Sequence, residues 1–203
     1  MKHDRIMIID YGSQYTQLIT RRVRELNVYA EIFPFDITQN DISSFSPKAI
    51  ILSGGPSSVY DKDAYTLSSN VISSKVPVLG ICYGLQLLIH NYGGKIVSKN
   101  RGEYGAAEVS FNTDNEIFHN LSESSNVWMS HGDEVESYHE DWSVIAKSNN
   151  GIIAALKHKT EKFYGVQFHP EVVHTAEGLE IISNFLFKIS NCNPTWTSKN
   201  FID

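Results

Sequence analysis

The sequence is poor in cysteine: Cys82 and Cys192 are the two cysteines among 203 residues. Two cysteines give no disulfide framework, and free thiols suit a reducing compartment. An apolar run long enough to cross a membrane is also missing, and the apolar segment after residue 5 is too short to be a signal peptide. We therefore expect a cytoplasmic protein with no membrane partner.

Basic stripes and metal-binding spacings are missing as well. The net charge is −6 and the acidic residues are scattered, which is unlike the charge pattern of nucleic-acid-binding proteins. None of the eight histidines is spaced from a cysteine or another histidine as in zinc motifs. We expect neither a nucleic acid partner nor a metal site. The length, with 41% hydrophobic and 20% charged residues, suits one large globular domain.

What the sequence does contain is a cysteine between two glycines. Residues 80–84 read Gly-Ile-Cys-Tyr-Gly after a short apolar run, which is typical of a nucleophile elbow, a sharp turn from strand to helix. Glycines two positions before and after the apex let the strand and helix approach closely. Cys82 would lie at a helix N-terminus, whose dipole favours the reactive thiolate. Taken alone, the cysteine fits a small buried side chain equally well.

A second segment supplies a base. Residues 163–168 have the composition of a strand and lead directly into His169, Pro170 and Glu171. Proline biases the residue before it toward extended backbone, in which side chains two positions apart point the same way. A Glu171 carboxylate on one imidazole nitrogen would leave the other nitrogen free to take the proton of Cys82. On its own this segment fits a solvated loop, but with the cysteine it predicts a Cys-His-Glu triad.

A third segment offers backbone donors. Residues 49–52 have the pattern of a buried strand and end in Ser-Gly-Gly-Pro at residues 53–56. Glycine there lets the backbone approach a ligand closely. The N–H groups of Gly55 and Tyr83 are predicted to form an oxyanion hole, in which loss of one donor costs about 10²- to 10³-fold in rate. Without the other two segments, residues 53–56 would be interpreted as an ordinary turn.

The order of the apolar segments predicts the fold. Strands are expected at residues 5–10, 29–33, 49–52 and 76–81, with helices at 14–26 and 65–73. This alternation is typical of a parallel sheet covered by helices on both faces, with ligands at the carboxyl ends of the strands.

The second half of the sequence has a different pattern. Short strands are expected at 95–98, 105–111, 143–146, 152–156 and 163–168, which suggests antiparallel pairing. A final helix is expected at 177–189, with Leu179, Ile182, Phe185, Leu186 and Ile189 as its apolar stripe. We therefore predict a three-layer α/β/α sandwich with a mixed, largely parallel central sheet and a small antiparallel addition.

In this order, the three motif segments resemble the signature of the class I glutamine amidotransferases, and the resemblance covers nearly the whole chain. It implies the flavodoxin-like fold of that family and attack of a cysteine on the side-chain amide of glutamine. Ammonia leaves, and a glutamyl thioester is hydrolysed to glutamate. By this resemblance Cys82 is the nucleophile, His169 is general base and then general acid, and Glu171 orients His169.

A narrower resemblance, to the amidotransferase part of GMP synthases, lies in residues 9–15, 128–133, 196–197 and 200–201. It implies a pocket for L-glutamine built from two loop glycines, one helix residue and a loop in the middle of the chain. These residues are Gly54, Gly55, Gln86, Ser130, His131, Gly132 and Asp133. Gln86 lies about one helical turn past Cys82, so the two side chains can share a face.

The same resemblance divides the sequence into an amidotransferase domain at 1–190 and a linker at 191–203. The linker would lead to an ATP-pyrophosphatase synthetase domain, absent from this chain, which adenylates xanthosine monophosphate (XMP) with ATP before ammonia displaces AMP. The phosphate-binding motif of that domain, Ser-Gly-Gly-Val-Asp-Ser, does not occur here. Residues 53–58 resemble it, but Pro56 lacks the N–H that a phosphate cradle uses. We expect no cofactor on this chain, with ATP and Mg²⁺ on the partner.

Several interpretations stay open. The chain fits either an excised domain or a stand-alone subunit. One alternative is another branch of the family, such as those that serve anthranilate, carbamoyl phosphate or CTP synthesis, or a related γ-glutamyl hydrolase. Residues 11–14 and 129–133 argue against it and favour the GMP synthase branch. An inactive interaction module of this fold is the remaining alternative, and the intact triad residues argue against it.

Overall fold

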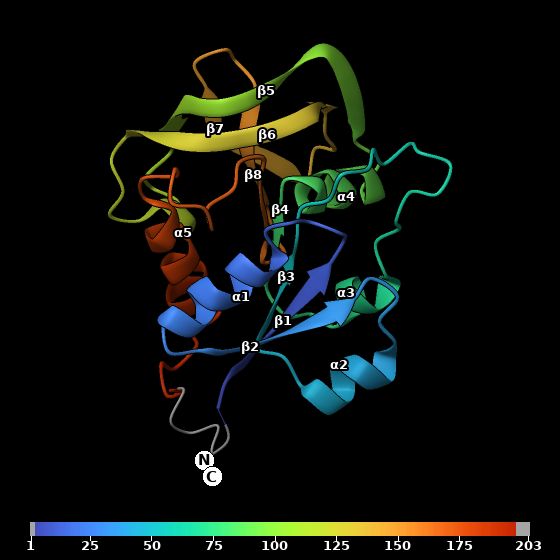
Figure 1. Ribbon diagram of the computed structural model, residues 1–203, viewed down its shortest axis with the longest axis vertical. Coiled ribbons are helices and arrows are strands. Elements are labelled where there is room, and N and C mark those ends of the chain that lie inside the picture. Colours follow the sequence, from blue (N-terminus) through green and yellow to red (C-terminus); the bar gives the residue numbers. More distant parts are fainter. Residues whose placement is uncertain (1–2, 198–203) are drawn as a thin grey trace.

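A computed structural model of the chain describes residues 3–197, apart from the side chains of residues 99–101. Within these residues the strands form one nine-stranded sheet in the order β2-β1-β3-β4-β9-β8-β7-β5-β6 (Figure 1). The strands are β1 (Arg5–Asp10), β2 (Tyr29–Pro34), β3 (Ala49–Leu52), β4 (Val78–Ile81), β5 (Lys95–Phe111), β6 (Ser124–Ser137), β7 (Trp142–Ser148), β8 (Ile153–His158) and β9 (Phe163–Val166). Strands β2, β1, β3, β4 and β9 pair in parallel, and the remaining pairs are antiparallel.

Helices cover both faces of the parallel part of the sheet. α1 (Thr16–Glu25) and α5 (Gly178–Asn184) lie on one face, and α2 (Gln39–Phe45), α3 (Ser69–Ser73) and α4 (Tyr83–Asn91) lie on the other (Figure 1). Side chains of a strand alternate between the two faces. Ile6 and Ile8 of β1 therefore enter the core beneath α1 and α5, whereas Met7 and Ile9 enter the core beneath α2 to α4. The three-layer sandwich with a mixed sheet is confirmed.

The antiparallel part is larger than predicted. The strands expected at 95–98 and 105–111 belong to one long strand, β5, which arches over the sheet beside β6 (Figure 1). The register shifts between Ser98 and Glu103, where extra residues of β5 lie opposite a short stretch of β6. Residues 130–133, which we expected to form a loop, lie inside β6. Their polar sequence lacks strand alternation because one side of this stretch borders a pocket.

Two helices differ from the sequence prediction. α2 was not predicted, although Thr38 and Asp41 form a capping box at its start. The final helix continues past Asn184 as a π-helical turn, Phe185–Ile189. Leu179 was expected in the apolar stripe but is 42% exposed. Its neighbour Gly178 faces inward instead, where any Cβ would overlap the carbonyl of Pro170.

The start of the predicted linker packs against the domain. The N–H of Cys192 donates to the carbonyl of Leu186 (2.9 Å), and the N–H of Trp196 donates to that of Asn27 (2.9 Å). The guanidinium of Arg24 lies 5.7 Å from the centre of the Trp196 ring. Residues 191–197 therefore contribute to the packed unit, and the rest of the predicted linker, 198–203, lies outside the described residues.

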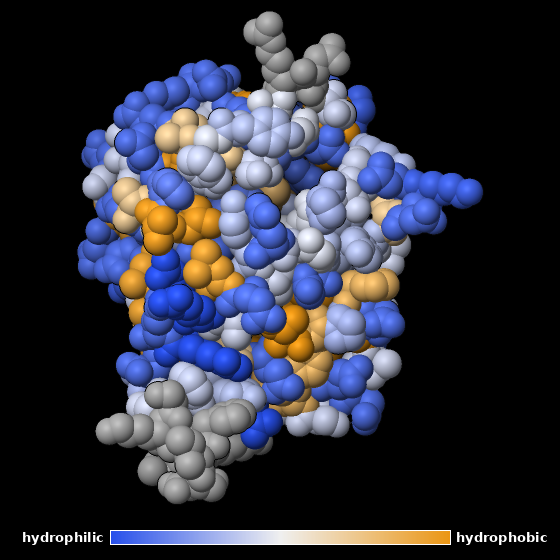
Figure 2. Space-filling view, viewed as in Figure 1, coloured by the Kyte–Doolittle hydropathy of each residue, from blue (hydrophilic) through white to orange (hydrophobic). Residues whose placement is uncertain are grey.

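The surface is mostly hydrophilic on the face shown in Figure 2, with small apolar patches between charged residues. The exposed large apolar side chains within the described part are Phe35, Tyr60, Tyr104, Tyr138, Val173 and Leu179. Among residues 3–197, no helix combines the length and the hydropathy needed to cross a membrane.

One edge of the parallel sheet collects the predicted motifs. β1, β3, β4 and β9 lie in register, so their carboxyl ends meet at the same edge. In the paired rows, Leu52 lies beside Gly80, and Gly80 lies beside Gly165. The chain segments that leave these strands at Tyr11, Ser53, Cys82 and Gln167 therefore meet, which agrees with the usual place of ligands in such sheets.

Candidate active site

Cys82 stands at a strained turn between β4 and α4. Its backbone has φ 52° and ψ −105°, a conformation that costs a non-glycine residue about 1–3 kcal/mol. The two flanking glycines are sterically required. A Cβ on Gly80 would lie 2.6 Å from the carbonyl of Gly84, and a Cβ on Gly84 would lie 2.5 Å from the carbonyl oxygen of Leu52. The predicted nucleophile elbow is therefore the observed local geometry.

His169 and Glu171 contact each other directly after β9. His169 Nδ1 lies 2.8 Å from Glu171 Oε1, and both side chains are buried. The segment is held on both sides. The N–H of His169 donates to the carbonyl of Trp128 on β6 (3.0 Å), and Nε of Arg22 on α1 donates to the carbonyl of Glu171 (2.9 Å).

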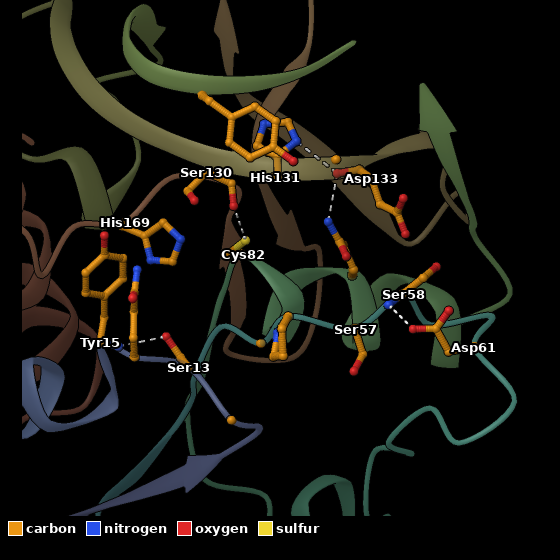
Figure 3. Close-up of a pocket in the computed structure, with 17 residues that line it drawn as sticks. Ser13, Tyr15, Ser57, Ser58, Asp61, Cys82, Ser130, His131, Asp133 and His169 are labelled. Atoms are coloured by element: carbon orange, nitrogen blue, oxygen red, sulfur yellow. Dashed lines mark hydrogen bonds between the residues drawn. The ribbon is translucent and has the colours of Figure 1, made fainter. Parts of the chain in front are cut away.

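The surroundings of His169 favour its protonated form. Burial alone would lower the pKa of His169, but hydrogen bonds and charge from Cys82 and Glu171 outweigh burial and raise that pKa to about 10. Because Glu171 accepts from Nδ1, that nitrogen carries a proton and Nε2 is the nitrogen available for exchange. The ring is also covered by Tyr15, whose centroid lies 5.1 Å from that of His169 (Figure 3).

The sulfur of Cys82 has contacts with two further elements. Its Sγ lies 3.7 Å from the carbonyl oxygen of Ser130 on β6 (Figure 3). The side-chain amide of Gln167, which follows β9, donates to the same sulfur at 3.7 Å. Gln167 was not predicted as a site residue. A polar residue at the end of an apolar strand was the only sequence signal for it.

Backbone donors are available beside the sulfur. Tyr83 is the first residue of α4, and the first N–H groups of a helix have no acceptor within it. The orientation of the other predicted donor, the N–H of Gly55, depends on the hydroxyl of Ser53. The N–H of Tyr11 donates to Ser53 Oγ (2.9 Å), and Ser53 Oγ donates to the carbonyl of Gly54 (2.8 Å). In a trans peptide the N–H of Gly55 points opposite to the carbonyl of Gly54, so Ser53 sets its direction.

Gly54 and Gly55 lie close to the reacting side chains. A Cβ on Gly54 would come within 3.1 Å of His169 Cε1 and 3.6 Å of Cys82 Cβ. A Cβ on Gly55 would lie 2.6 Å from the carbonyl oxygen of Tyr11. Gly55 therefore requires glycine for the loop to pass this close to Tyr11, whereas a Cβ on Gly54 would need the His169 ring to shift by a few tenths of an ångström.

A pocket of about 690 Å³ opens above Cys82 (Figure 3). Of the predicted glutamine-binding residues, all but Gly54 line it, and Gly54 adjoins the triad instead. Sequence reasoning did not assign a role to the lining residues Gly12, Ser13, Gln14, Tyr15, Pro56, Ser57, Ser58, Asp61 and Tyr104. Most of them follow the carboxyl ends of β1 and β3. The usual position of ligands at that edge of a parallel sheet was the sequence signal that could have identified them.

The wall of the pocket formed by β6 is tied to α4. Gln86 Nε2 donates to the carbonyl of Asp133 (2.9 Å), and His131 Nδ1 donates to the same oxygen (2.9 Å). Burial lowers the pKa of His131, so this ring is neutral at pH 7. Asp133 Oδ2 is buried and has no hydrogen-bond partner among the described residues. It is therefore an unused acceptor beside the pocket.

Within the described part of the chain, no group of three or more histidine, cysteine, aspartate and glutamate side chains is arranged to hold a metal ion.

Most of the chain matches a single enzyme family. Residues 7–189 match the family Glutamine amidotransferase class-I. The chain belongs to the class I glutamine amidotransferases. The family resemblance predicted from residues 53–56, 80–84 and 169–171 is therefore confirmed.

Relatives of this family member include glutamine-hydrolysing GMP synthases. The enzyme of Brachyspira hyodysenteriae is 50% identical over 200 residues, which are 98% of this chain and 39% of the relative. The enzyme of Caldicellulosiruptor saccharolyticus is 47% identical over 203 residues, which are 100% of this chain and 40% of the relative. The chain therefore spans less than half the length of these relatives.

Solved structures show the same fold. A Thermoplasma acidophilum protein, provisionally assigned as one subunit of a GMP synthase, superposes with a TM-score of 0.81 at 30% identity, over 94% of this chain and 96% of that protein. A glutamine amidotransferase from Thermotoga maritima superposes with a TM-score of 0.67 at 20% identity, over 96% of this chain and 88% of that protein. The second likeness supports the fold alone.

Proposed function

We propose that this chain hydrolyses L-glutamine to L-glutamate and ammonia, with Cys82 as nucleophile. The observation that carries the proposal is the hydrogen bond between His169 Nδ1 and Glu171 Oε1 (2.8 Å) beside a cysteine at a strained elbow. This arrangement follows the logic of a catalytic triad.

In the first half-reaction, His169 takes the thiol proton of Cys82, which leaves a thiolate beside an imidazolium. The thiolate attacks the side-chain carbonyl carbon of glutamine, and the N–H groups of Gly55 and Tyr83 stabilise the resulting oxyanion. The carbon–nitrogen bond then breaks. His169 gives its Nε2 proton to the leaving nitrogen, which departs as ammonia and leaves a γ-glutamyl thioester on Cys82.

In the second half-reaction, neutral His169 takes a proton from a water molecule that attacks the thioester carbon. The carbon–sulfur bond breaks, glutamate leaves, and the thiolate of Cys82 again faces the imidazolium of His169. Glu171 keeps its hydrogen bond to Nδ1 throughout, so it orients the ring and stabilises its positive charge.

The polar wall of the pocket suits the amino acid end of glutamine. Asp133 Oδ2 is buried and unpaired among the described residues, and an α-ammonium group would supply the donor it lacks. Ser130, His131 and Gly132 line the same side, while Gln86 holds the backbone of Asp133. We propose that these residues, with Gly54 and Gly55, bind glutamine with its side chain directed toward Cys82.

The proposed destination of the ammonia is an ATP-pyrophosphatase synthetase, as a separate subunit or as a further domain. The support is the similarity to glutamine-hydrolysing GMP synthases, of which this chain matches 39–40%. In this proposal the partner binds ATP, Mg²⁺ and XMP and makes GMP in the cytoplasm, and this chain needs no cofactor of its own. Residues 191–203 lead toward the partner. We further propose that the isolated chain hydrolyses glutamine slowly or not at all until the partner binds.

A glutaminase assay with and without the synthetase tests the proposal. We expect glutamate release to depend on Cys82, to be abolished in Cys82→Ala, and to rise when the synthetase, ATP and XMP are added. Activation by the synthetase of another branch, such as that for CTP, would contradict the GMP assignment but keep the glutaminase. Absence of turnover with every synthetase, together with failure of a diazoketone analogue of glutamine to label Cys82, would favour an inactive module.

A further inference from the structure

Gln167 is a buried amide that has no role in the proposed half-reactions. It lies between β9 and His169, and its side chain is fully buried. Burying an amide is unfavourable unless its polar atoms are hydrogen-bonded. Among the residues that the structure describes, its amide nitrogen has one acceptor, the sulfur of Cys82 at 3.7 Å. Gln167 does not line the glutamine pocket, so substrate contact does not explain it.

The orientation of this amide follows from its neighbours. The carbonyl oxygen of Asp133 can only accept, so the atom of Gln86 that lies 2.9 Å from it is the amide nitrogen. The second hydrogen of that nitrogen points to Gln167, at 3.4 Å. The atom of Gln167 facing Gln86 is therefore its oxygen, and its NH₂ group faces Cys82. The two side chains form a chain of hydrogen bonds from the backbone of Asp133 to the sulfur.

The two contacts of the sulfur favour opposite protonation states. The carbonyl of Ser130, 3.7 Å from Sγ, can accept only from a thiol. The amide of Gln167 donates, and a donor favours the charged form of the group that accepts from it. Gln167 therefore favours the thiolate of Cys82, as His169 does, but it carries no charge and does not exchange its proton during turnover.

We propose that Gln167 is a catalytic residue that donates a hydrogen bond to the thiolate of Cys82, and that Gln86 holds its amide in the donating orientation. The inference rests on the proposed function, because a stabilised thiolate serves the attack on glutamine. Its first test is independent of turnover: alkylation of Cys82 by iodoacetamide, followed as a function of pH.

Gln167→Met removes the donor at similar volume, and Gln167→Glu replaces the donor by an acceptor. We expect the pH midpoint of Cys82 alkylation to rise by about one unit in Gln167→Met, equivalent to about a tenfold lower thiolate fraction at neutral pH. The midpoint should rise at least as far in Gln167→Glu. Gln86→Met should raise it less, because the amide of Gln167 remains present but is free to rotate. Peptide mass spectrometry separates Cys82 from Cys192.

Asn184→Leu is the matched control. Asn184 is also a buried amide and donates to the carbonyls of Ile117 and His119, far from the cysteine. We expect this variant to lower the melting temperature but to keep the alkylation midpoint of the wild type. This separates the general effect of losing a buried amide from an effect on the sulfur.

Glutamine turnover with the synthetase partner gives the second readout. The Gln167 variants should lose about tenfold or more in kcat with little change in KM, because the residue does not line the pocket. A folded Gln167→Met or Gln167→Glu variant with the wild-type alkylation midpoint overturns the inference, whatever the turnover. A shifted midpoint in a protein that never hydrolyses glutamine keeps the inference about the thiolate and rejects the proposed function instead.

Discussion

His169 Nδ1 and Glu171 Oε1 lie 2.8 Å apart, and a single residue, Pro170, separates His169 from Glu171 in the chain. Both side chains are buried. Glu171→Gln would keep the shape of the side chain but remove its charge. By analogy with triads in which the acid is replaced by its amide, we expect glutaminase kcat to fall by about 10²- to 10⁴-fold. Initial rates at saturating glutamine with the synthetase partner measure this.

A variant that melts like the wild type is needed for that comparison, so the thermal unfolding of Glu171→Gln should be followed by circular dichroism. A folded variant with a rate within twofold of the wild type would remove Glu171 from the mechanism.

The pH profile should also depend on this pair. Burial lowers the pKa of His169, but its hydrogen bonds with Cys82 and Glu171 outweigh burial and raise it to about 10 from the usual 6.5. The protonated ring, which gives its proton to the leaving ammonia, therefore persists through neutral pH and is lost as pH approaches 10. We expect kcat/KM to fall on the alkaline side near that pH. Glu171→Gln should move the alkaline fall to lower pH, and a wild-type fall near pH 6.5 would be inconsistent with this assignment.

Ser53 is expected to act through the oxyanion hole. Its hydroxyl accepts from the N–H of Tyr11 and donates to the carbonyl of Gly54, which sets the direction of the N–H of Gly55. Ser53→Ala should lower kcat by roughly 10- to 100-fold, less than the loss of an oxyanion donor itself, with KM little changed. Steady-state kinetics measure both constants.

Ser74→Ala provides the control for Ser53→Ala. The Ser74 hydroxyl donates to the carbonyl of Val71 at the end of α3, away from the pocket. The Ser74→Ala variant should be less stable than the wild type but should keep its kcat. Equal kcat in Ser53→Ala and the wild type would show that the loop holds the Gly55 donor without this hydroxyl.

His158 should contribute a loss of stability on the acid side because it is held neutral in the folded state. Burial lowers the pKa of His158, and its Nδ1 accepts from the backbone N–H groups of Glu161 (3.1 Å) and Thr160 (3.3 Å). As pH falls below about 6.5, the unfolded chain binds this proton before the folded chain does, so the folded state loses stability. The raised pKa of His169 acts in the opposite direction over this range, so the loss due to His158 is measured by urea unfolding of the wild type and a His158 variant between pH 7.5 and 5.5.

His158→Asn retains an acceptor but does not titrate, so as pH falls over the same range its free energy of unfolding should fall less, or rise more, than that of the wild type. Some dependence should remain, because burial lowers the pKa of His131 and the surroundings of His169 raise its pKa, with opposite effects on stability. An unchanged pH dependence in His158→Asn would mean that His158 is not the group responsible.

The sequence predicted the parts of the molecule that depend on local pattern. The predicted strands at 5–10 and 49–52 have the bounds that the structure shows. The elbow at Cys82 follows from the two flanking glycines, because a Cβ at either position would clash with backbone atoms. His169 and Glu171, on either side of Pro170, contact each other as predicted, although residues 170–171 form a turn rather than the expected extended backbone. These features are set by short stretches of chain and by the rules of parallel sheets.

What the sequence did not predict depends on contacts between distant segments. Residues 130–133 lie in a strand because β5 pairs with them, although their polar sequence lacks the alternation of a strand. Ser53 and Gln167 gain their roles from Gly54 and Cys82, which reach them only after the sheet has formed. Leu179 is exposed because Gly178 takes the position against Pro170.

Acylation of Cys82 by glutamine is the central step of the proposed reaction, and trapping the acylated enzyme tests that step most directly. The protein is mixed with glutamine and its synthetase partner, quenched in acid within a turnover, and digested for peptide mass spectrometry. We predict a mass increase of one glutamyl group on the peptide that contains Cys82, absent from Cys82→Ala and enriched in variants that slow hydrolysis of the thioester. Turnover of glutamine without any adduct at Cys82, or with an adduct at Cys192, would contradict the account.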